Sequence, residues 1–326
     1  DLVLEASRRL VVFVNAYQET VNGNQSVNLS LLNLQDAKAR FENGIGTKLD
    51  LLEAQIQLNK DQQFLIDKDN NFKSADNALK SILYIDDDYN FVFNKEASIY
   101  GWWDYPLEKN ILFGIKNSID LKNIASNKLI RLNESKIAIA KTMPSFFIKN
   151  ESTATFSEGE SLVPEVDKEA YQNSYNNSVS LNFSWDIFDG GVSRNESKNS
   201  KLQAKIEDLN YKIESNLLRE EIRNRYKILK ADEKKIFISR KELDAAIEAM
   251  KLSRLRLNNG VATQREVINS QKDLTAAKST FYRNIANYNI SLISLKRLTG
   301  LDLSGLCEST DNQNENNKIC FYGEFD

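Results

Sequence analysis

An internal repeat at a constant offset of 216 residues limits the possible folds of this chain more than any other feature. The segment Arg40–Gln55 resembles Arg254–Gln271 without a gap. Apolar positions also correspond farther along both copies, as in Leu58 with Leu274 and Leu79 with Leu295. A period of this length far exceeds that of a solenoid unit. The sequence therefore predicts a duplicated half-protein.

Each copy of the repeat carries the signals of a helix end followed by a helix start. Glycine just past a helix end supplies the left-handed conformation that stops the helix, and a threonine with an acidic residue three positions on is typical of a capping box. The first copy has Asn43-Gly44, Thr47 and Asp50, and the second has Asn259-Gly260, Thr263 and Glu266. Each copy thus predicts a helical hairpin with a tight tip, and capping alone would explain the two acidic residues.

The helices are expected to be long. The region from about residue 194 to residue 258 contains no proline, and an apolar residue recurs there every three or four positions, as in the seam of a coiled coil. These residues are Leu202, Ile206, Leu209, Ile213 and Leu217. The default interpretation is a stripe that faces the core.

Composition excludes several functions. Histidine is absent, and the chain has only two cysteines, Cys307 and Cys320, so a Cys–His zinc site and the commonest general base are both excluded. Neither a glycine-rich phosphate loop nor a nucleophile elbow is present. We therefore expect no enzyme, no metal and no cofactor. For the two cysteines, a disulfide in an oxidising compartment is favoured over two unpaired thiols.

Charge and hydropathy restrict the partners further. The net charge is only −3, which gives no indication of nucleic-acid binding. No run of 18 apolar residues predicts a transmembrane helix, and the first residues already have a helical rhythm in place of a signal peptide. We therefore expect the chain to start within an element and to lack upstream segments.

The segment NSVSLNFSWDIFDGG, which ends at Gly191, alternates apolar and polar residues with period two. It predicts a strand, and the Phe- and Thr-rich segment after Pro144 predicts its partner. Strands of about 9–11 residues can cross a bilayer, but two strands alone are not stable, so strands from elsewhere are required. Pro144, Gly190 and Gly191 are expected at the strand–helix junctions. In the connector before them, Trp102 and Trp103 more often pack a linker onto a bundle than form a ligand platform.

Together these segments resemble the TolC-type outer-membrane efflux protein family. The resemblance is carried by ARFENGIGTKLDLLEAQ, LNNGVATQREVINSQ, SLNFSWDIFDGGVSR and the closing LISLKRLTG. It implies a mainly α fold with a small β part, in which long coiled-coil hairpins and membrane strands form a trimeric α/β-barrel tunnel. It also implies an outer-membrane exit duct that reaches into the periplasm and is gated at its helical tips. The implied partners are a periplasmic adaptor, an inner-membrane transporter and outer-membrane lipid.

Site residues follow from the same resemblance. The tip residues expected to contact the adaptor are Gly44, Ile45, Gly260 and Val261, and those expected at the pore constriction are Glu266, Asp50 and Asn269. Two departures stand out, because family members carry an arginine where this chain has Ala262 and a second pore aspartate at Asn269. A gate closed by that arginine is therefore not expected, and one ring of Glu266 carboxylates would favour cations.

The expected organisation has six parts: a first helical hairpin (1–83), a connector (84–106), a helix (107–143), a membrane β-hairpin (144–191), a long second hairpin (192–300) and a polar tail (301–326). Subtracting 216 from the strand positions places the first repeat's strands upstream of residue 1. Two alternatives compete with the channel, namely a periplasmic adaptor and a soluble coiled-coil scaffold. The adaptor would show one hairpin with Gly- and Val-rich flanks, whereas this chain shows two hairpins.

Overall fold

The computed structural model describes residues 2–86, 89, 91, 97–160 and 169–301. It divides into two compact units. The first comprises Asp1–Ser118 and Leu217–Asp326, and the second comprises Ile119–Asn216. Most of the described residues are helical, and the described strands form one two-stranded antiparallel sheet. This mainly α fold with a small β part is the one that the sequence predicted.

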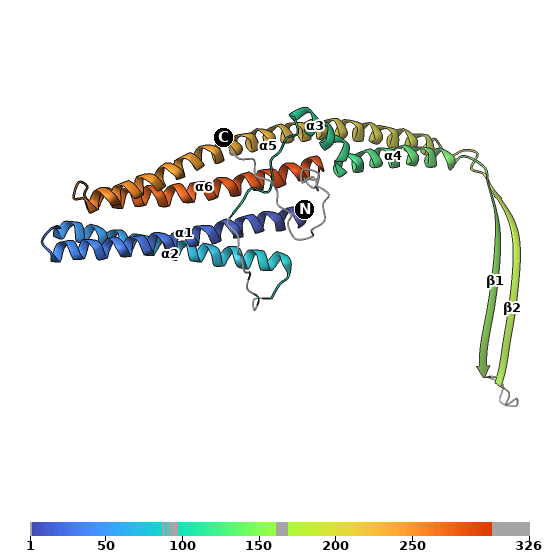
Figure 1. Ribbon diagram of the computed structural model, residues 1–326. Coiled ribbons are helices and arrows are strands. Elements are labelled where there is room, and N and C mark those ends of the chain that lie inside the picture. Colours follow the sequence, from blue (N-terminus) through green and yellow to red (C-terminus); the bar gives the residue numbers. More distant parts are fainter. Residues whose placement is uncertain (1, 87–88, 90, 92–96, 161–168, 302–326) are drawn as a thin grey trace, which may run out of the picture. The chain divides into compact units, whose positions relative to one another are not determined.

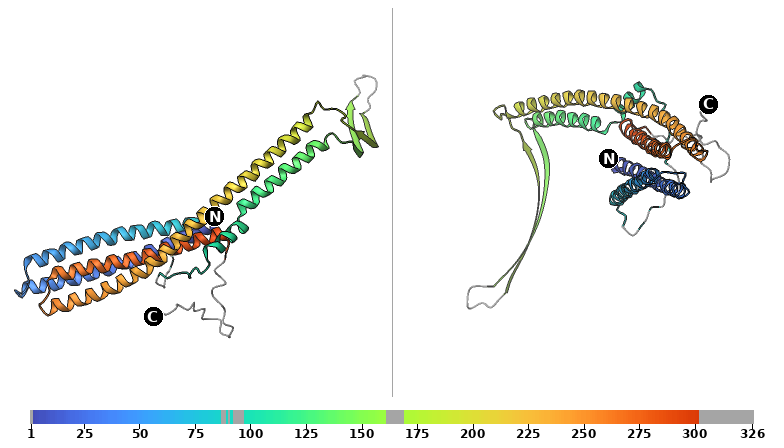
Figure 2. Two further views of the ribbon diagram at one scale, coloured as in Figure 1. Left: turned by 90° about the horizontal axis from the view of Figure 1, so that it is seen from above. Right: turned by 90° about the vertical axis from the view of Figure 1, so that its left-hand side faces the viewer.

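The first unit is built from long helices arranged as hairpins (Figures 1 and 2). Helix α1 (Leu2–Glu42) turns into α2 (Lys48–Leu83), and α5 (Val192–Asn258) turns into α6 (Gln264–Thr299). The C-terminal part of α5 lies in this unit, together with the short helix α3 (Leu107–Asn117). Helix α1 packs against both α2 and α6, so the two hairpins lie side by side with α1 and α6 in the middle.

Apolar clusters hold each hairpin together. In the second hairpin the cluster joins α5 to α6 and contains Leu243, Ala246, Met250, Leu257, Val267, Leu274 and Ala277. In the first hairpin it joins α1 to α2 and contains Phe13, Val14, Ala16, Ala75 and Leu79. Several leucine-sized side chains lie in each cluster, and each stabilises the fold by roughly 1.5–3 kcal/mol when it is fully buried.

The connector packs onto the second hairpin. Trp103 is buried in a cluster with residues of α5 and α6, and its indole N–H donates to Oδ1 of Asn110 at 3.1 Å. The hydroxyl of Tyr288 donates to the carbonyl of Gly101 at 3.0 Å. These contacts confirm for Trp103 that it packs a linker onto the bundle, because a buried indole offers no ligand platform.

The single helix that the sequence predicted over residues 107–143 is divided in the structure. Helix α3 ends at Asn117, and Ser118 adopts a non-helical ψ of 123°. The side chain of Asn117 donates to the carbonyl of Thr299 at 2.9 Å, which ties the end of α3 to the end of α6. Helix α4 then runs from Ile119 to Ala140.

In the second unit, α4 packs against the first part of α5 through small residues. The hydroxyls of Ser135 and Ser197 lie 2.8 Å apart, and Ala138 and Ala204 are buried. Lys128 adds an ion pair with Asp208 at 2.6 Å. Small side chains allow the two helix backbones to approach closely.

The sequence predicted that the apolar stripe of α5 faces the core. Within the described chain this prediction is wrong. Leu202, Ile206, Leu209, Ile213 and Leu217 remain 51–58% exposed. The residues that α5 buries in this region are Ser193, Ser197, Ala204 and Ser215. The apolar residues that recur every three or four positions do share one face of α5, but no described part of the chain covers that face.

The β-hairpin consists of β1 (Ser145–Glu160) and β2 (Glu169–Ser184), each of 16 residues. Both strands are longer than the about 9–11 residues that cross a bilayer, because the backbone ladder continues to the pair Glu160 and Glu169. The register places Phe146 opposite Phe183 and Ile148 opposite Leu181. Since neighbouring residues of a strand point to opposite faces, one face here is apolar.

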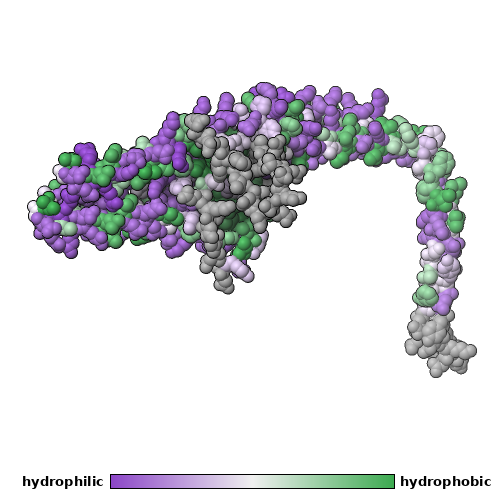
Figure 3. Space-filling model, in the orientation of Figure 1, coloured by the Kyte–Doolittle hydropathy of each residue, from purple (hydrophilic) through white to green (hydrophobic). Residues whose placement is uncertain are grey.

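The opposite face of the β-hairpin is mostly polar. The register pairs Lys149 with Ser180 and Glu151 with Ser178 there, with Phe147 as an exception. Hydrophobic residues gather on the strands toward their helical end and along α4 (Figure 3). Within the described residues, no helix is both long and apolar enough to span a membrane.

The strand–helix junction is fixed by hydrogen bonds around the double glycine. The Asp189 carboxylate accepts from the backbone N–H of Gly191 at 2.8 Å and of Ser193 at 2.7 Å, so it caps α5. Gly190 and Gly191 have φ values of 66° and 84°, which glycine adopts without strain. The indole N–H of Trp185 donates to the carbonyl of Thr142 at 3.2 Å and links the two sides of the junction.

We predict that the cap at Asp189 keeps the first turn of α5 closed. Its carboxylate accepts from two backbone N–H groups, which a helix start otherwise leaves without partners, and alanine has no acceptor to replace it. Amide hydrogen exchange at residues 191–195 should therefore be faster in Asp189→Ala than in the wild type at pH 7. Equal exchange of the two proteins at pH 7 would contradict this capping role.

Candidate gating site at the helical tips

The two tips have the same backbone geometry, as the repeat predicted. Gly44 and Gly260 both have a φ of 73°. After each glycine an N–H donates back into the preceding helix, from Ile45 to Arg40 at 3.0 Å and from Val261 to Arg256 at 2.9 Å. These bonds satisfy carbonyl groups that a helix end leaves without partners.

The acidic residues of the two tips have different partners. Asp50 completes a capping box, because its carboxylate accepts from the N–H of Thr47 at 3.0 Å while the Thr47 hydroxyl accepts from the N–H of Asp50 at 3.1 Å. Thr263 caps α6 in the same way through the N–H of Glu266. The Glu266 carboxylate, however, lies 3.6 Å from the guanidinium of Arg256. Capping therefore accounts for Asp50 but not for the Glu266 side chain.

The other candidate residues lie on the surface. Ile45 is 74% exposed and Val261 is 64% exposed, so both apolar tip residues are accessible to a partner. Asn269 is exposed on α6. The candidate disulfide residues, Cys307 and Cys320, lie outside the described residues.

The structure adds an ion pair that the sequence interpretation missed. Arg265 at the start of α6 contacts both carboxylate oxygens of Glu53 on α2, with Nε 3.2 Å from Oε2. The Glu53 carboxylate raises the pKa of the Arg265 guanidinium above its ordinary value. This pair joins the two tips, and it lies three residues after Ala262, where the family comparison had expected an arginine.

A second contact joins the same two tips. The guanidinium of Arg40 on α1 donates to the carbonyl of Leu257 on α5 at 2.8 Å. Arg40 and Arg256 occupy the same position of the repeat, yet Arg256 bonds within its own tip, to the carbonyl of Val261. The repeat alone could have drawn attention to these arginines, but it could not indicate which one crosses to the other hairpin.

The described chain thus combines long paired helices with an amphipathic β-hairpin. A model of the family described as "Outer membrane efflux protein" matches residues 131–301, more than half of the chain. The chain therefore belongs to the outer membrane efflux protein family. It is an efflux channel of the outer membrane that extends into the periplasm, and neither the adaptor nor the scaffold alternative is favoured. The family consists of channel proteins and not of enzymes.

Solved structures share the fold at low sequence identity. The chain is similar to a membrane protein from Pseudomonas aeruginosa, at 17% identity and a TM-score of 0.69, over 92% of this chain and 68% of that one. It is also similar to VceC from Vibrio cholerae, at 13% identity and a TM-score of 0.65, over 92% and 70%. The CmeC outer membrane channel of Campylobacter jejuni gives 16% identity and a TM-score of 0.64, over 92% and 62%. No curated protein sequence gives a significant match.

We predict that the ion pair between Arg265 and Glu53 holds the two tips together. Arg265→Gln and Glu53→Gln should each increase the conductance of single channels in planar bilayers, and the double variant should add nothing further, because one contact is lost in all three. Arg131→Gln is the matched control, since it removes an arginine–glutamate pair within α4. Additive effects of the two single variants would contradict a shared contact.

Proposed function

We propose that this channel is a homotrimeric exit duct that works with a periplasmic adaptor and an inner-membrane transporter. In this proposal residues 144–191 form the outer-membrane part, while 1–83 and 192–300 form the tunnel. The connector is residues 84–106, the second-repeat helix is residues 107–143 and the polar tail is residues 301–326. Cargo passes through the tunnel without chemical change.

One observation carries the trimer proposal, which is that apolar surface and strand edges lie uncovered in a single copy. Among the described residues, β1 and β2 pair only with each other, so each has an open edge. Strand edges in a membrane must be closed by further strands. The exposed apolar stripe of α5 also requires cover, and a second copy of the chain would supply helices and strands for both surfaces.

The tips are the proposed contacts with the partners. Gly44, Ile45, Gly260 and Val261 form the two turns that an adaptor would meet, and the exposure of Ile45 and Val261 supports this assignment. Glu266, Asp50 and Asn269 are proposed to line the constriction. A periplasmic duct served by an adaptor and a transporter fits the membership of the efflux family.

The stripe of α5 supplies the first test. Leu209→Glu should convert the trimer of the full-length protein in detergent to monomers, because a buried carboxylate in each copy would be desolvated at the interface. Light scattering coupled to gel filtration measures the mass. Asn210→Glu, one residue away and off the stripe, is the control and should leave the trimer intact. A wild-type monomer, or an unchanged mass in Leu209→Glu, would contradict the proposal.

The acidic ring supplies the second test. Three Glu266 carboxylates around a narrow axis would concentrate negative potential and favour cations. Glu266→Gln should therefore lower the cation-to-anion permeability ratio toward one, as measured from reversal potentials in a salt gradient. Asp50→Asn should have a smaller effect, because the Asp50 carboxylate already accepts a backbone hydrogen bond. An unchanged ratio in Glu266→Gln would refute this role.

A further inference from the structure

The two helical hairpins meet through hydrogen bonds, although an apolar cluster holds each hairpin together. Along α1 the residues buried toward α6 include Asn22, Ser26, Ser30 and Asn33, and the facing residues of α6 include Gln264, Gln271, Thr275 and Ser279. Closer to the tips, Ala37, Ala54 and Ile268 add a small apolar cluster. Helix α6 thus has an apolar face toward α5 and a polar face toward α1.

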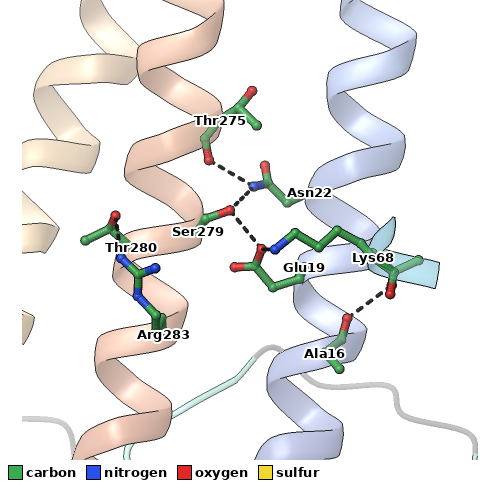
Figure 4. Close-up of polar contacts among 9 residues, drawn as sticks. Ala16, Glu19, Asn22, Lys68, Thr275, Ser279, Thr280 and Arg283 are labelled. Carbon is green, nitrogen blue, oxygen red and sulfur yellow. Dashed lines mark hydrogen bonds and ion pairs between the residues drawn. The ribbon is translucent and has the colours of Figure 1, made fainter. Parts of the chain in front are cut away.

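Part of this contact appears in Figure 4. The amide of Asn22 donates to the carbonyl of Thr275 and to the hydroxyl of Ser279, both at 3.0 Å. The Ser279 hydroxyl donates to the Glu19 carboxylate at 3.0 Å, and Lys68 of α2 pairs with the same carboxylate at 2.8 Å. Each of the residues named in this paragraph therefore has a partner on a different helix.

The contact between α1 and α6 centres on Gln271, which is completely buried. Its amide donates to the Ser26 carbonyl at 3.1 Å and to the Asp61 carboxylate of α2 at 3.0 Å, while its carbonyl oxygen accepts from Asn33 at 2.5 Å. Asp61 also accepts from Gln57 at 3.0 Å and from Ser30. We call Gln271, Asp61, Ser30 and Asn33 the polar cluster. It joins α1, α2 and α6.

Although the sequence repeats, the residues of the polar cluster come together in only one of the two copies. Gln55, the counterpart of Gln271, is exposed and bonds only along its own helix, to Asn59 at 3.1 Å. The counterparts of Ser30 and Asp61 are Ala246 and Ala277, which lie in the apolar cluster of the second hairpin. At these positions of the repeat, only the first hairpin therefore offers a carboxylate, and α6 brings Gln271 to it.

We propose that Gln271 and Asp61 are positioning residues that fix the register of α6 on the first hairpin. A displacement by one helical turn, about 5.4 Å, would place Ile268 or Thr275 opposite Asp61. Gln271 would then be buried without its acceptors, and unmade buried hydrogen bonds are costly. Apolar contacts such as those between α5 and α6 are not directional, so they set the register less strictly. Only the consequence for the gate rests on the proposed function.

The register can be measured directly in the full-length protein. Nitroxide labels at Asp36→Cys on α1 and Asp273→Cys on α6, in a background with Cys307→Ser and Cys320→Ser, report the distance between the two helices by double electron–electron resonance. The wild type should give one narrow intraprotomer distance. Gln271→Glu places two carboxylates together and should broaden it or add a second distance shifted by about 5 Å, one helical turn.

Two further variants separate register from general stability. Gln55→Glu makes the same change at the counterpart position and should leave the distance unchanged. The double variant Gln271→Glu with Asp61→Asn exchanges the amide and the carboxylate, so the hydrogen bond between them can form again and the narrow distance should return. Circular dichroism verifies that each variant is folded. A narrow wild-type distance in Gln271→Glu, or no recovery in the double variant, would overturn the proposal.

The functional consequence has its own readout. Gln271→Glu should also raise single-channel conductance at least as much as Glu53→Gln, because the register of α6 sets where the second tip lies. If the wild-type protein conducted no ions at all, the proposed function would fail while the distance measurements would still decide the register. Altered distances with unchanged conductance would refute only the link between register and gate.

Discussion

The fold of the first unit depends on the contact between α1 and α6, which joins two hairpins that are each held together by an apolar cluster. Folding this contact exchanges hydrogen bonds with water for hydrogen bonds between helices, so its net stabilisation is modest, about 0.5–1.5 kcal/mol for a typical bond. Its geometry is nevertheless strict, because each donor must meet a particular acceptor. Helix α6 can therefore be strongly bound to α5 and precisely placed on α1 at the same time.

The placement of α6 on α1 also sets where the two tips lie. The caps at Thr47 and Thr263 start α2 and α6 in the same way, and the ion pair between Arg265 and Glu53 joins the tips at the surface. Exposed ion pairs are weak and are screened by salt. The arrangement thus combines a buried contact that positions the helices with a surface contact that can break readily, which suits the gate that we propose at the tips.

The sequence predicted the hairpins, both tips and the amphipathic strands, because these depend on local signals such as Asn43-Gly44, Thr263 and the period-two pattern that runs to Ile187. It could not predict contacts that depend on which helix faces which. The stripe from Leu202 to Leu217 was assigned to the core, although α4 is covered by Ser197 and Ala204 instead. Likewise, Gln271 and Gln55 are equivalent in sequence, and only the packing makes one buried and the other exposed.

The central claim is that one copy of this chain is an incomplete channel whose open strand edges and apolar α5 stripe are covered by other copies. Electron cryomicroscopy of the full-length protein in lipid nanodiscs tests this claim most directly. We predict a three-fold symmetric particle in which Leu209 and Ile213 pack against a neighbouring copy and the β-hairpins join into one closed sheet. A single copy with the α5 stripe in contact with solvent, or with β1 and β2 unpaired at their outer edges, would contradict it.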